Sequence, residues 1–284
     1  MSHFSIPQHL VGQAVERALA EDLGGRGDIT SKATIPSQTE ARFVIQSRVA
    51  GVVAGIAAAT ETFGQVDSRI KLNWRLDDGD RVTGGQVMAE LSGPARSILT
   101  AERTALNFLG RLSGIATATR AYVDAVAGSK ARIAHTRKTT PGLRALELAA
   151  VMAGGGSPHR FGLDDAILIK DNHVAVCGGI AAAIASARRV AGHMTRIAVE
   201  IDRLDQLQEA IDAGAESILL DNFSLADLAA AVERAGGRGM TLEASGGVDL
   251  ATVRDIAATG VDVISIGAIT HSAGNFDVGL DTVD

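Results

Sequence analysis

The sequence is short of several residue types, and each shortage excludes a class of protein. A single cysteine, Cys177, excludes an internal disulfide framework and a thiolate zinc cluster. Aromatic residues make up only 3% of the chain, so the stacking surfaces that bind single-stranded nucleic acid are largely missing, and the net charge of -6 disfavours nucleic acid further. Apolar runs are too short to cross a membrane. We therefore expect neither nucleic acid nor a membrane as a partner.

The N-terminal sequence also lacks a basic segment followed by an apolar one, so no secretory signal is expected and the cytoplasm is the default location. What the chain does have is 284 residues, of which 46% are hydrophobic. This is enough to bury the core of one large α/β domain and of a smaller one. A cytoplasmic enzyme is the simplest expectation.

The N-terminal part combines helical and strand patterns. Apolar residues on one face predict a helix over 7–22. The segments 41–49 and 72–93 place apolar residues between turn sequences such as DDGD and TGG, which is typical of strands and hairpins. A long helix with one apolar face is predicted over 95–109. We expect a half-β unit that leads through this helix into a second domain.

Beyond residue 130, short apolar strands alternate with Ala-rich helices. The spacing between strands is that of a compact βα unit, and the helices end in glycine. Similar units in succession favour a parallel α/β barrel over an open doubly wound sheet. The predicted strands begin at residues 132, 166, 197, 217, 240 and 263.

Charged residues follow the predicted strands at their C-terminal ends, where the loops of a parallel barrel build the active site. Glu200 and Asp221 end two strands, and Arg137, Lys138 and Lys170 end two others. Between residues 130 and 173, seven Lys and Arg stand against four Asp and Glu, although the whole chain is acidic. This reversal points to a small, highly anionic substrate.

Glycine-rich segments predict a phosphate site at the last strands of the barrel. EASGG (243–247) precedes a helix and SIGA (265–268) follows the next strand, so backbone N–H groups of both can meet a phosphate. Ser245, Gly246 and Gly267 are the natural contacts. AGGG (153–156) is less specific; because it precedes SPHR, it is expected to let His159 and Arg160 swing over a ligand.

Seven motifs together resemble one known family. ERTALNFL, HTRKTTPGLR, GGGSPHR, LIKDNH, LLDN, EASGG and ISIGA, in that order, resemble the quinolinate phosphoribosyltransferases, also called nicotinate-nucleotide pyrophosphorylases (carboxylating). The resemblance covers essentially the whole chain. It implies an N-terminal α/β sandwich domain over 1–110, an open α/β barrel of about seven strands over 111–270, and a tail over 271–284 that packs back on the N-terminal domain.

The resemblance also implies an activity. Quinolinate and phosphoribosyl pyrophosphate would give nicotinate mononucleotide, pyrophosphate and carbon dioxide, with Mg²⁺ as cofactor. It implies a homodimer with shared active sites, each receiving an arginine from the neighbouring subunit. The sequence leaves open whether dimers assemble into a higher homo-oligomer.

The site residues that the resemblance implies suit this chemistry. The resemblance implies that Arg137, His159 and Arg160, with the partner's Arg103, form a dicarboxylate pocket, and guanidinium groups bind carboxylates bidentately. Glu200 and Asp221 would face the ribose and the Mg²⁺-pyrophosphate, directly or through substrate or water. The expected substrate-binding residues are Arg103, Thr136, Arg137, Lys138, His159, Arg160, Lys170, Glu200, Asp221, Ser245, Gly246 and Gly267, of which Lys138, Lys170, Glu200 and Asp221 are expected to be catalytic.

Two positions depart from the family pattern. Leu148 stands where many relatives have a lysine, and Pro158 stands where asparagine is common. These departures leave open a divergent pyrophosphorylase-like paralogue that uses another acceptor. The intact LIKDNH argues against it.

Two other classes of protein remain as alternatives. Lys170 at a strand end could form an imine in a Schiff-base aldolase, although the phosphate apparatus is more than an aldolase requires. The segment DDGDRVTGGQVMAEL is similar to the hairpin of lipoyl or biotinyl carrier domains, but its turn contains no lysine to modify, which makes a carrier role improbable.

Overall fold

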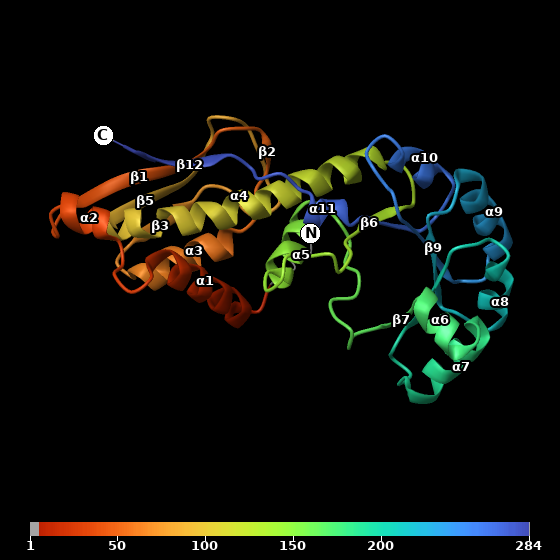
Figure 1. Cartoon of the computed structure of the whole chain (residues 1–284). Coiled ribbons are helices and arrows are strands. Elements are labelled where there is room, and N and C mark those ends of the chain that lie inside the picture. Colours follow the sequence, from red (N-terminus) through yellow and green to blue (C-terminus); the bar gives the residue numbers. More distant parts are fainter. Residues whose placement is uncertain (1–5, 284) are drawn as a thin grey trace. The chain divides into compact units, whose positions relative to one another are not determined.

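The computed structural model describes residues 6–283, and the chain divides into two compact units (Figure 1). Unit 1 combines three stretches, Met1–Arg120, Thr139–Gly155 and Ile269–Asp284. Unit 2 combines the other two, Ala121–Lys138 and Gly156–Ala268. The units are therefore not consecutive in sequence, because the chain returns twice from unit 2 to unit 1.

Unit 1 contains a four-stranded sheet in the order β12-β1-β5-β3, with every neighbouring pair antiparallel. The first and last strands of the chain to enter this sheet lie side by side, with Phe43 opposite Thr282. Strands β2 and β4 form a separate two-stranded antiparallel sheet in the same unit. The elements of unit 1 are α1 (Gln8–Leu23), α2 (Ile29–Thr34), β1 (Glu40–Ser47), β2 (Gly51–Val52), α3 (Ile56–Val66), β3 (Lys71–Trp74), β4 (Arg81–Val82), β5 (Val87–Pro94), α4 (Ala95–Ala125), α5 (Arg144–Ala153), α11 (Ala268–His271) and β12 (Val278–Thr282), with the last turn of α4 and the first residue of α11 in unit 2.

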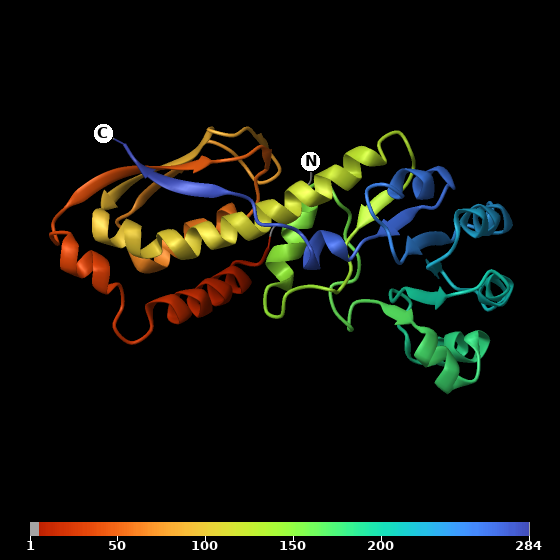
Figure 2. The same ribbon diagram turned by 45° about the horizontal axis from the view of Figure 1, so that its top comes forward.

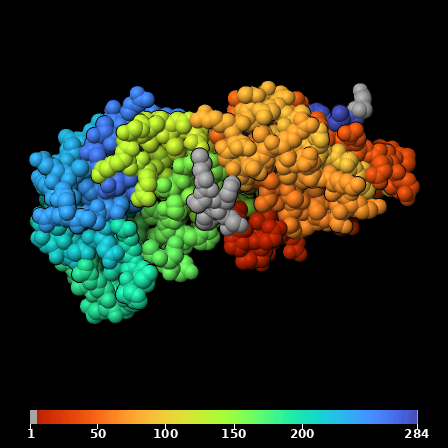
Figure 3. Space-filling model, turned by 180° about the vertical axis from the view of Figure 1, so that it is seen from behind, coloured from red at the N-terminus to blue at the C-terminus, as the bar shows by residue number. Residues whose placement is uncertain are grey.

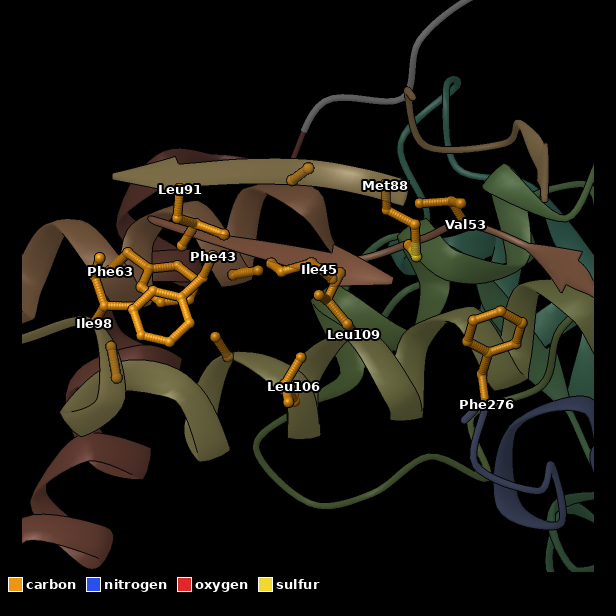
Figure 4. Close-up of a cluster of buried hydrophobic side chains, with 14 of the residues drawn as sticks. Phe43, Ile45, Val53, Phe63, Met88, Leu91, Ile98, Leu106, Leu109 and Phe276 are labelled. Atoms are coloured by element: carbon orange, nitrogen blue, oxygen red, sulfur yellow. The ribbon is translucent and has the colours of Figure 1, made fainter. Parts of the chain in front are cut away.

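The core of unit 1 lies between this sheet and helices α3 and α4 (Figure 4). The alternating inward residues of β1, Phe43 and Ile45, are buried, as β-strand geometry requires of one face. They pack with Phe63 of α3 and with Ile98 and Leu109 of α4. Apolar residues recurring along one side of α4 therefore anchor the helix to the sheet.

Helix α4 is much longer than the sequence predicted, because Gly110 and Gly114 do not end it. A Cβ on Gly114 would lie 2.0 Å from the carbonyl oxygen of Gly274, and one on Gly110 would lie 3.0 Å from that of Phe276. The backbone N–H of Phe276 donates to the carbonyl of Gly110 at 2.8 Å. The glycines thus allow the C-terminal segment to approach the helix closely. The expected domain boundary between residues 110 and 111 falls inside this continuous helix.

Unit 2 is built on a six-stranded parallel sheet in the order β6-β11-β10-β9-β8-β7. Helices α8, α9 and α10 lie along one side of the strands (Figure 2), and in the space-filling view residues 171–258 form much of the visible surface of unit 2 (Figure 3). This is the α/β architecture that the repeated βα spacing predicted. Its elements are β6 (Arg132–Ala134), β7 (Ile167–Ile169), α6 (Asp171–Cys177), α7 (Ile180–Val190), β8 (Ile197–Ile201), α8 (Gln206–Asp212), β9 (Ser217–Asp221), α9 (Leu225–Ala235), β10 (Thr241–Ser245), α10 (Val253–Ala258) and β11 (Val263–Ser265).

The sheet of unit 2 has six strands where the resemblance implied about seven. The place of a further strand is taken by an isolated parallel bridge between Ala134 and Ser157. Pro158 follows directly and has no N–H to donate, so it interrupts the ladder. Within the described residues β6 and β7 are the two edges of the sheet, and the barrel is open between them.

Candidate active site

The sheet register of unit 2 brings the acidic strand ends into adjacent rows. Glu200 of β8 and Glu243 of β10 each lie opposite Leu219 of β9, so all three share one row and one face. One step towards the C-terminal ends, Asp221 of β9 lies opposite Ser245 of β10. Carboxylates and a predicted phosphate-binding serine therefore meet at the C-terminal edge, where a parallel barrel builds its active site.

Lys170 contributes a cation to the same row. It follows β7 directly, and its Nζ forms an ion pair with Glu200 Oε2. The backbone N–H of Lys170 donates to His173 Nδ1 at 2.9 Å, which fixes the start of α6. The LIKDNH segment thus holds an ammonium and a carboxylate together at the strand ends.

Arg137 and Arg160 form a concentrated positive charge. Burial lowers the pKa of Arg160, and the neighbouring guanidinium of Arg137 lowers it further. Within residues 6–283, the buried Nε of Arg137 has no hydrogen-bond partner. Two like charges held close together, one with an unused donor, are suited to an anionic ligand that accepts from both.

His159 lies next to this pair with both of its ring nitrogens engaged. Its Nδ1 accepts the backbone N–H of Arg160 at 2.8 Å, and its Nε2 lies 3.3 Å from Glu243 Oε2. Its own backbone N–H donates to Nε2 of the buried His135 at 3.0 Å. His159 is therefore fixed by its surroundings, and the direct contact with substrate that the sequence predicted for it stays a prediction.

Asp221 is oriented by the residue that follows it. Asn222 Nδ2 donates to Asp221 Oδ2 at 2.8 Å, and the backbone N–H of Asn222 donates to the carbonyl of Ser245 at 2.8 Å. Gly246 packs against Asn222 so closely that a Cβ would lie 2.2 Å from Asn222 Oδ1, and its φ of +89° favours glycine. The LLDN and EASGG segments therefore contact one another through Asn222, Ser245 and Gly246.

The other expected residues also have definite places. Thr136 Oγ1 accepts the backbone N–H of Lys138 at 3.2 Å, which shapes the turn that carries the exposed Lys138 side chain. Gly267 follows β11, beside the ends of the other strands. Arg103 is exposed on α4 in unit 1, so its expected place in a neighbouring subunit's site stays a prediction.

The donor set does not form a metal site by itself. Among residues 6–283, no group of three or more His, Cys, Asp and Glu side chains could hold a metal ion. Glu200 and Asp221 offer only carboxylate oxygens, which suit a hard cation whose remaining ligands are water and substrate oxygens.

A cavity of about 630 Å³ lies at the opposite, N-terminal ends of the strands, lined by Arg196, Glu216 and Met240, so volume alone does not mark the site.

Comparison with known proteins decides the family. Residues 28–113 match the N-terminal domain of quinolinate phosphoribosyl transferase, and residues 115–281 match its C-terminal domain. The chain belongs to the quinolinate phosphoribosyltransferase family. A nicotinate-nucleotide pyrophosphorylase (carboxylating) of Mycobacterium leprae is 45% identical over 273 residues, which are 94% of this chain and 95% of that protein.

Other members of the family agree. A probable nicotinate-nucleotide pyrophosphorylase (carboxylating) of Bacillus subtilis is 45% identical over 262 residues, 92% of this chain and 89% of that protein. The solved structure of the Francisella tularensis nicotinate-nucleotide pyrophosphorylase has 40% identity and a TM-score of 0.93, with 98% of each chain covered. The fold and family that the motifs implied are confirmed.

Two residues of this phosphoribosyltransferase site were missed by sequence reasoning. Asn222 stands in LLDN and Glu243 begins EASGG, but neither was assigned a role of its own. The alternation of β10 does place Glu243 on the same face as Ser245, but it gives Glu243 no function. Leu148, by contrast, is 4% exposed on α5 in unit 1, so the departure from the family's lysine places an apolar side chain in a core.

Proposed function

We propose that this quinolinate phosphoribosyltransferase transfers the phosphoribosyl group of phosphoribosyl pyrophosphate to quinolinate. The pyridine nitrogen forms a bond to C1 of the ribose as the bond from C1 to pyrophosphate breaks. The carboxylate next to the ring nitrogen then leaves as carbon dioxide, its bonding electrons pass to the cationic ring, and a proton takes its place. The products are nicotinate mononucleotide, pyrophosphate and carbon dioxide, the reaction of the family to which the chain belongs.

The observation that carries this proposal is the pair Arg137 and Arg160. A dicarboxylate accepts from two guanidinium groups at once, and its charge offsets the burial and the repulsion from Arg137 that lower the pKa of Arg160. Among the described residues, the buried Nε of Arg137 has no hydrogen-bond partner, so it can donate one more hydrogen bond. Quinolinate has two adjacent carboxylates, and therefore fits this pair better than a monocarboxylate does.

The other half of the site suits phosphoribosyl pyrophosphate. Breaking the bond at C1 develops positive charge on the sugar and negative charge on the pyrophosphate. Glu200 and Asp221 would stabilise the sugar, while Lys138 and Lys170 would hold the pyrophosphate and carboxylate oxygens. The segments of Ser245, Gly246 and Gly267 would bind the 5′-phosphate. Catalysis then rests on position and charge, and no covalent nucleophile is needed.

Mg²⁺ is part of the proposal as a companion of phosphoribosyl pyrophosphate. Two carboxylates without a third ligand bind Mg²⁺ weakly, whereas pyrophosphate oxygens complete its coordination. Asp221 is the better candidate for a contact through water, because Glu200 is already paired with Lys170. The ion would supply charge stabilisation to the leaving group.

Assembly and location belong to the same proposal. We expect a homodimer in which Arg103 enters the partner's site, in the cytoplasm. Within the described residues no helix is long and apolar enough to cross a membrane.

A pyrophosphate-release assay tests the function. Purified protein with phosphoribosyl pyrophosphate and Mg²⁺ should release pyrophosphate only when quinolinate is added, in equal amount to nicotinate mononucleotide and carbon dioxide. Nicotinate in place of quinolinate is the matched control, because it lacks the second carboxylate. Release that does not depend on quinolinate, or equal turnover of both acids, would contradict the proposal.

The aldolase alternative has no observation in its favour. Lys170 donates to Glu200 in a half-exposed ion pair, not in the apolar pocket that activates a Schiff-base lysine.

A further inference from the structure

The hydrogen bonds of His159 decide where its proton lies. Nδ1 accepts the backbone N–H of Arg160 at 2.8 Å, so Nδ1 carries no proton. The ring proton therefore stands on Nε2, which faces Glu243 Oε2 at 3.3 Å. One nitrogen therefore accepts from the backbone of Arg160, and the other faces a carboxylate of the protein.

His159 is also held from behind. Its backbone N–H donates to His135 Nε2 at 3.0 Å, and the two rings meet edge to face with centroids 6.2 Å apart. His135 directly follows β6 and is 2% exposed, so it forms a rigid support. The contacts run from His135 after β6 through His159 to Glu243 on β10, and the backbone N–H of Arg160 joins them at Nδ1 of His159.

Glu243 is an unusual side chain to find inside the sheet. Its side chain is 9% exposed, and its Oε1 is buried without a hydrogen-bond partner among residues 6–283. Burying a carboxylate with one oxygen unsatisfied is costly. A further carboxylate beside a site for anionic substrates also opposes their binding, unless a cation compensates it. The fold keeps a group here that neither stability nor simple charge attraction requires.

We propose that Glu243 is a positioning residue for quinolinate binding, which acts through His159 on the backbone of Arg160. The inference rests on the proposed function for its substrate. Glu243 holds the proton of His159 on Nε2, and this leaves Nδ1 as the acceptor that anchors the Arg160 N–H. Without Glu243 the ring can place its proton on Nδ1, where it opposes the N–H of Arg160. The backbone from which the Arg160 side chain extends is then no longer held in place.

Substitutions at Glu243 test this directly. Glu243→Ala should raise the KM for quinolinate by about tenfold or more, because the ring that anchors Arg160 loses the carboxylate that orients it, while the KM for phosphoribosyl pyrophosphate stays within about twofold. Glu243→Gln, which can still accept from Nε2–H, should recover part of the loss. Ser217→Ala is the matched control: its buried hydroxyl lies on the neighbouring strand β9, at the opposite end of the strands, where it donates to the carbonyl of Thr241, and its removal should leave the KM for quinolinate unchanged.

Two substitutions of His159 separate positioning from direct contact. The amide oxygen of His159→Asn can take the place of Nδ1, whereas the amide of His159→Gln reaches the place of Nε2. If His159 anchors Arg160, the KM for quinolinate should be lower in His159→Asn than in His159→Gln. If Nε2 binds substrate, the KM should be lower in His159→Gln.

A double mutant tests whether Glu243 acts through His159. In the His159→Asn background the side chain no longer reaches Glu243, so Glu243→Ala should change the KM for quinolinate by less than about twofold. An undiminished effect in that background would overturn the inference. So would a Glu243→Ala protein that melts earlier but keeps its KM for quinolinate, because that is the result of a purely structural role.

An activity-independent measurement keeps this inference separate from the proposed function. Two-bond ¹H–¹⁵N spectra should assign the His159 signal, identified by its loss in His159→Asn, to the Nε2–H form, and in Glu243→Ala to a mixture with Nδ1–H. An unchanged tautomer in Glu243→Ala would overturn the inference whatever the enzyme turns over. Failure of the wild-type protein to use quinolinate would instead reject the proposed function and leave the tautomer result standing.

Discussion

At the scale of single residues, the parts of the site differ in how their charges are paired. Burial lowers the pKa of the Arg160 guanidinium, and the nearby Arg137 lowers it further, while Asp165 and Glu200 act in the opposite direction. Lys170 and Glu200, in contrast, compensate one another. The strand ends therefore contain a cationic part suited to an anion and an ion-paired part suited to a sugar.

We predict that Arg137→Ala weakens quinolinate binding by on the order of 2–5 kcal/mol, because a desolvated carboxylate loses its charged partner. Isothermal titration with quinolinate measures the change. Arg132→Ala is the control, since Arg132 is exposed at the start of β6, whereas Arg137 follows the end of that strand, and the change should not alter binding. Wild-type affinity in Arg137→Ala would remove Arg137 from the dicarboxylate site.

We predict that Asp221→Asn keeps the fold but shifts the Mg²⁺ dependence of the rate to higher concentration and weakens phosphoribosyl pyrophosphate more than quinolinate. The reason is that Asn cannot supply the negative charge that a hydrated Mg²⁺ requires. Titration of activity against Mg²⁺, together with a melting curve, measures both effects. Asp202→Asn, at an exposed surface pair with Arg203, should change neither. An earlier melt with unchanged Mg²⁺ dependence would mean that Asp221 only holds the strand ends together.

At the scale of elements, strands were easier to predict than the ends of helices. The predicted starts at 197, 217 and 263 coincide with those of β8, β9 and β11, because buried parallel strands are continuous apolar runs. The helix expected to stop before Gly110 instead continues to Ala125. Local sequence shows that glycine weakens a helix, but it does not show which backbone will pass close to it.

The contacts of the site were less predictable for the same reason. The alternation of side chains along a strand was enough to place Glu200 and Asp221 at the C-terminal edge of the sheet, because alternation depends only on residues close in the sequence. The contact of His159 with Glu243 joins two segments that lie far apart in the sequence, and no spacing rule reports it. β6 was expected to run to Lys138 but ends at Ala134, because its pairing with β11 stops at Ser265.

We predict opposite effects for two glycine-to-alanine changes in helices of unit 1. Gly114→Ala should lower the free energy of unfolding by about 1–3 kcal/mol, because its Cβ would meet the backbone of Gly274. Gly64→Ala, in α3 with nothing within 4 Å, should raise it by about 0.5–1 kcal/mol. Urea unfolding measures both. Stabilisation by Gly114→Ala would show that the C-terminal segment does not pack against α4.

At the scale of the whole molecule, the expected shared site gives a test by mixing. Inactive Arg103→Ala and inactive Lys138→Ala proteins carry their changes in different units. After subunit exchange in equal amounts, half of the dimers are hybrids with one intact site, so roughly a quarter of the wild-type activity should return.

The control for this prediction mixes Arg137→Ala with Lys138→Ala. Both changes lie in unit 2, so every hybrid site keeps one defect and no activity should return. A mixture of Arg103→Ala and Lys138→Ala that stays inactive after exchange has been demonstrated by mass spectrometry would contradict a shared site.

The antiparallel pairing of β1 with β12 has a consequence for biosynthesis. β1 is made early, but its outer edge is covered only when residues 278–282 have left the ribosome. Until then β1 is an unpaired edge strand with free N–H and carbonyl groups, which is a template for aggregation. All six strands of unit 2 are synthesised within that interval. The nascent chain is therefore most vulnerable at its N-terminal sheet, and the last strand to be translated ends that vulnerability.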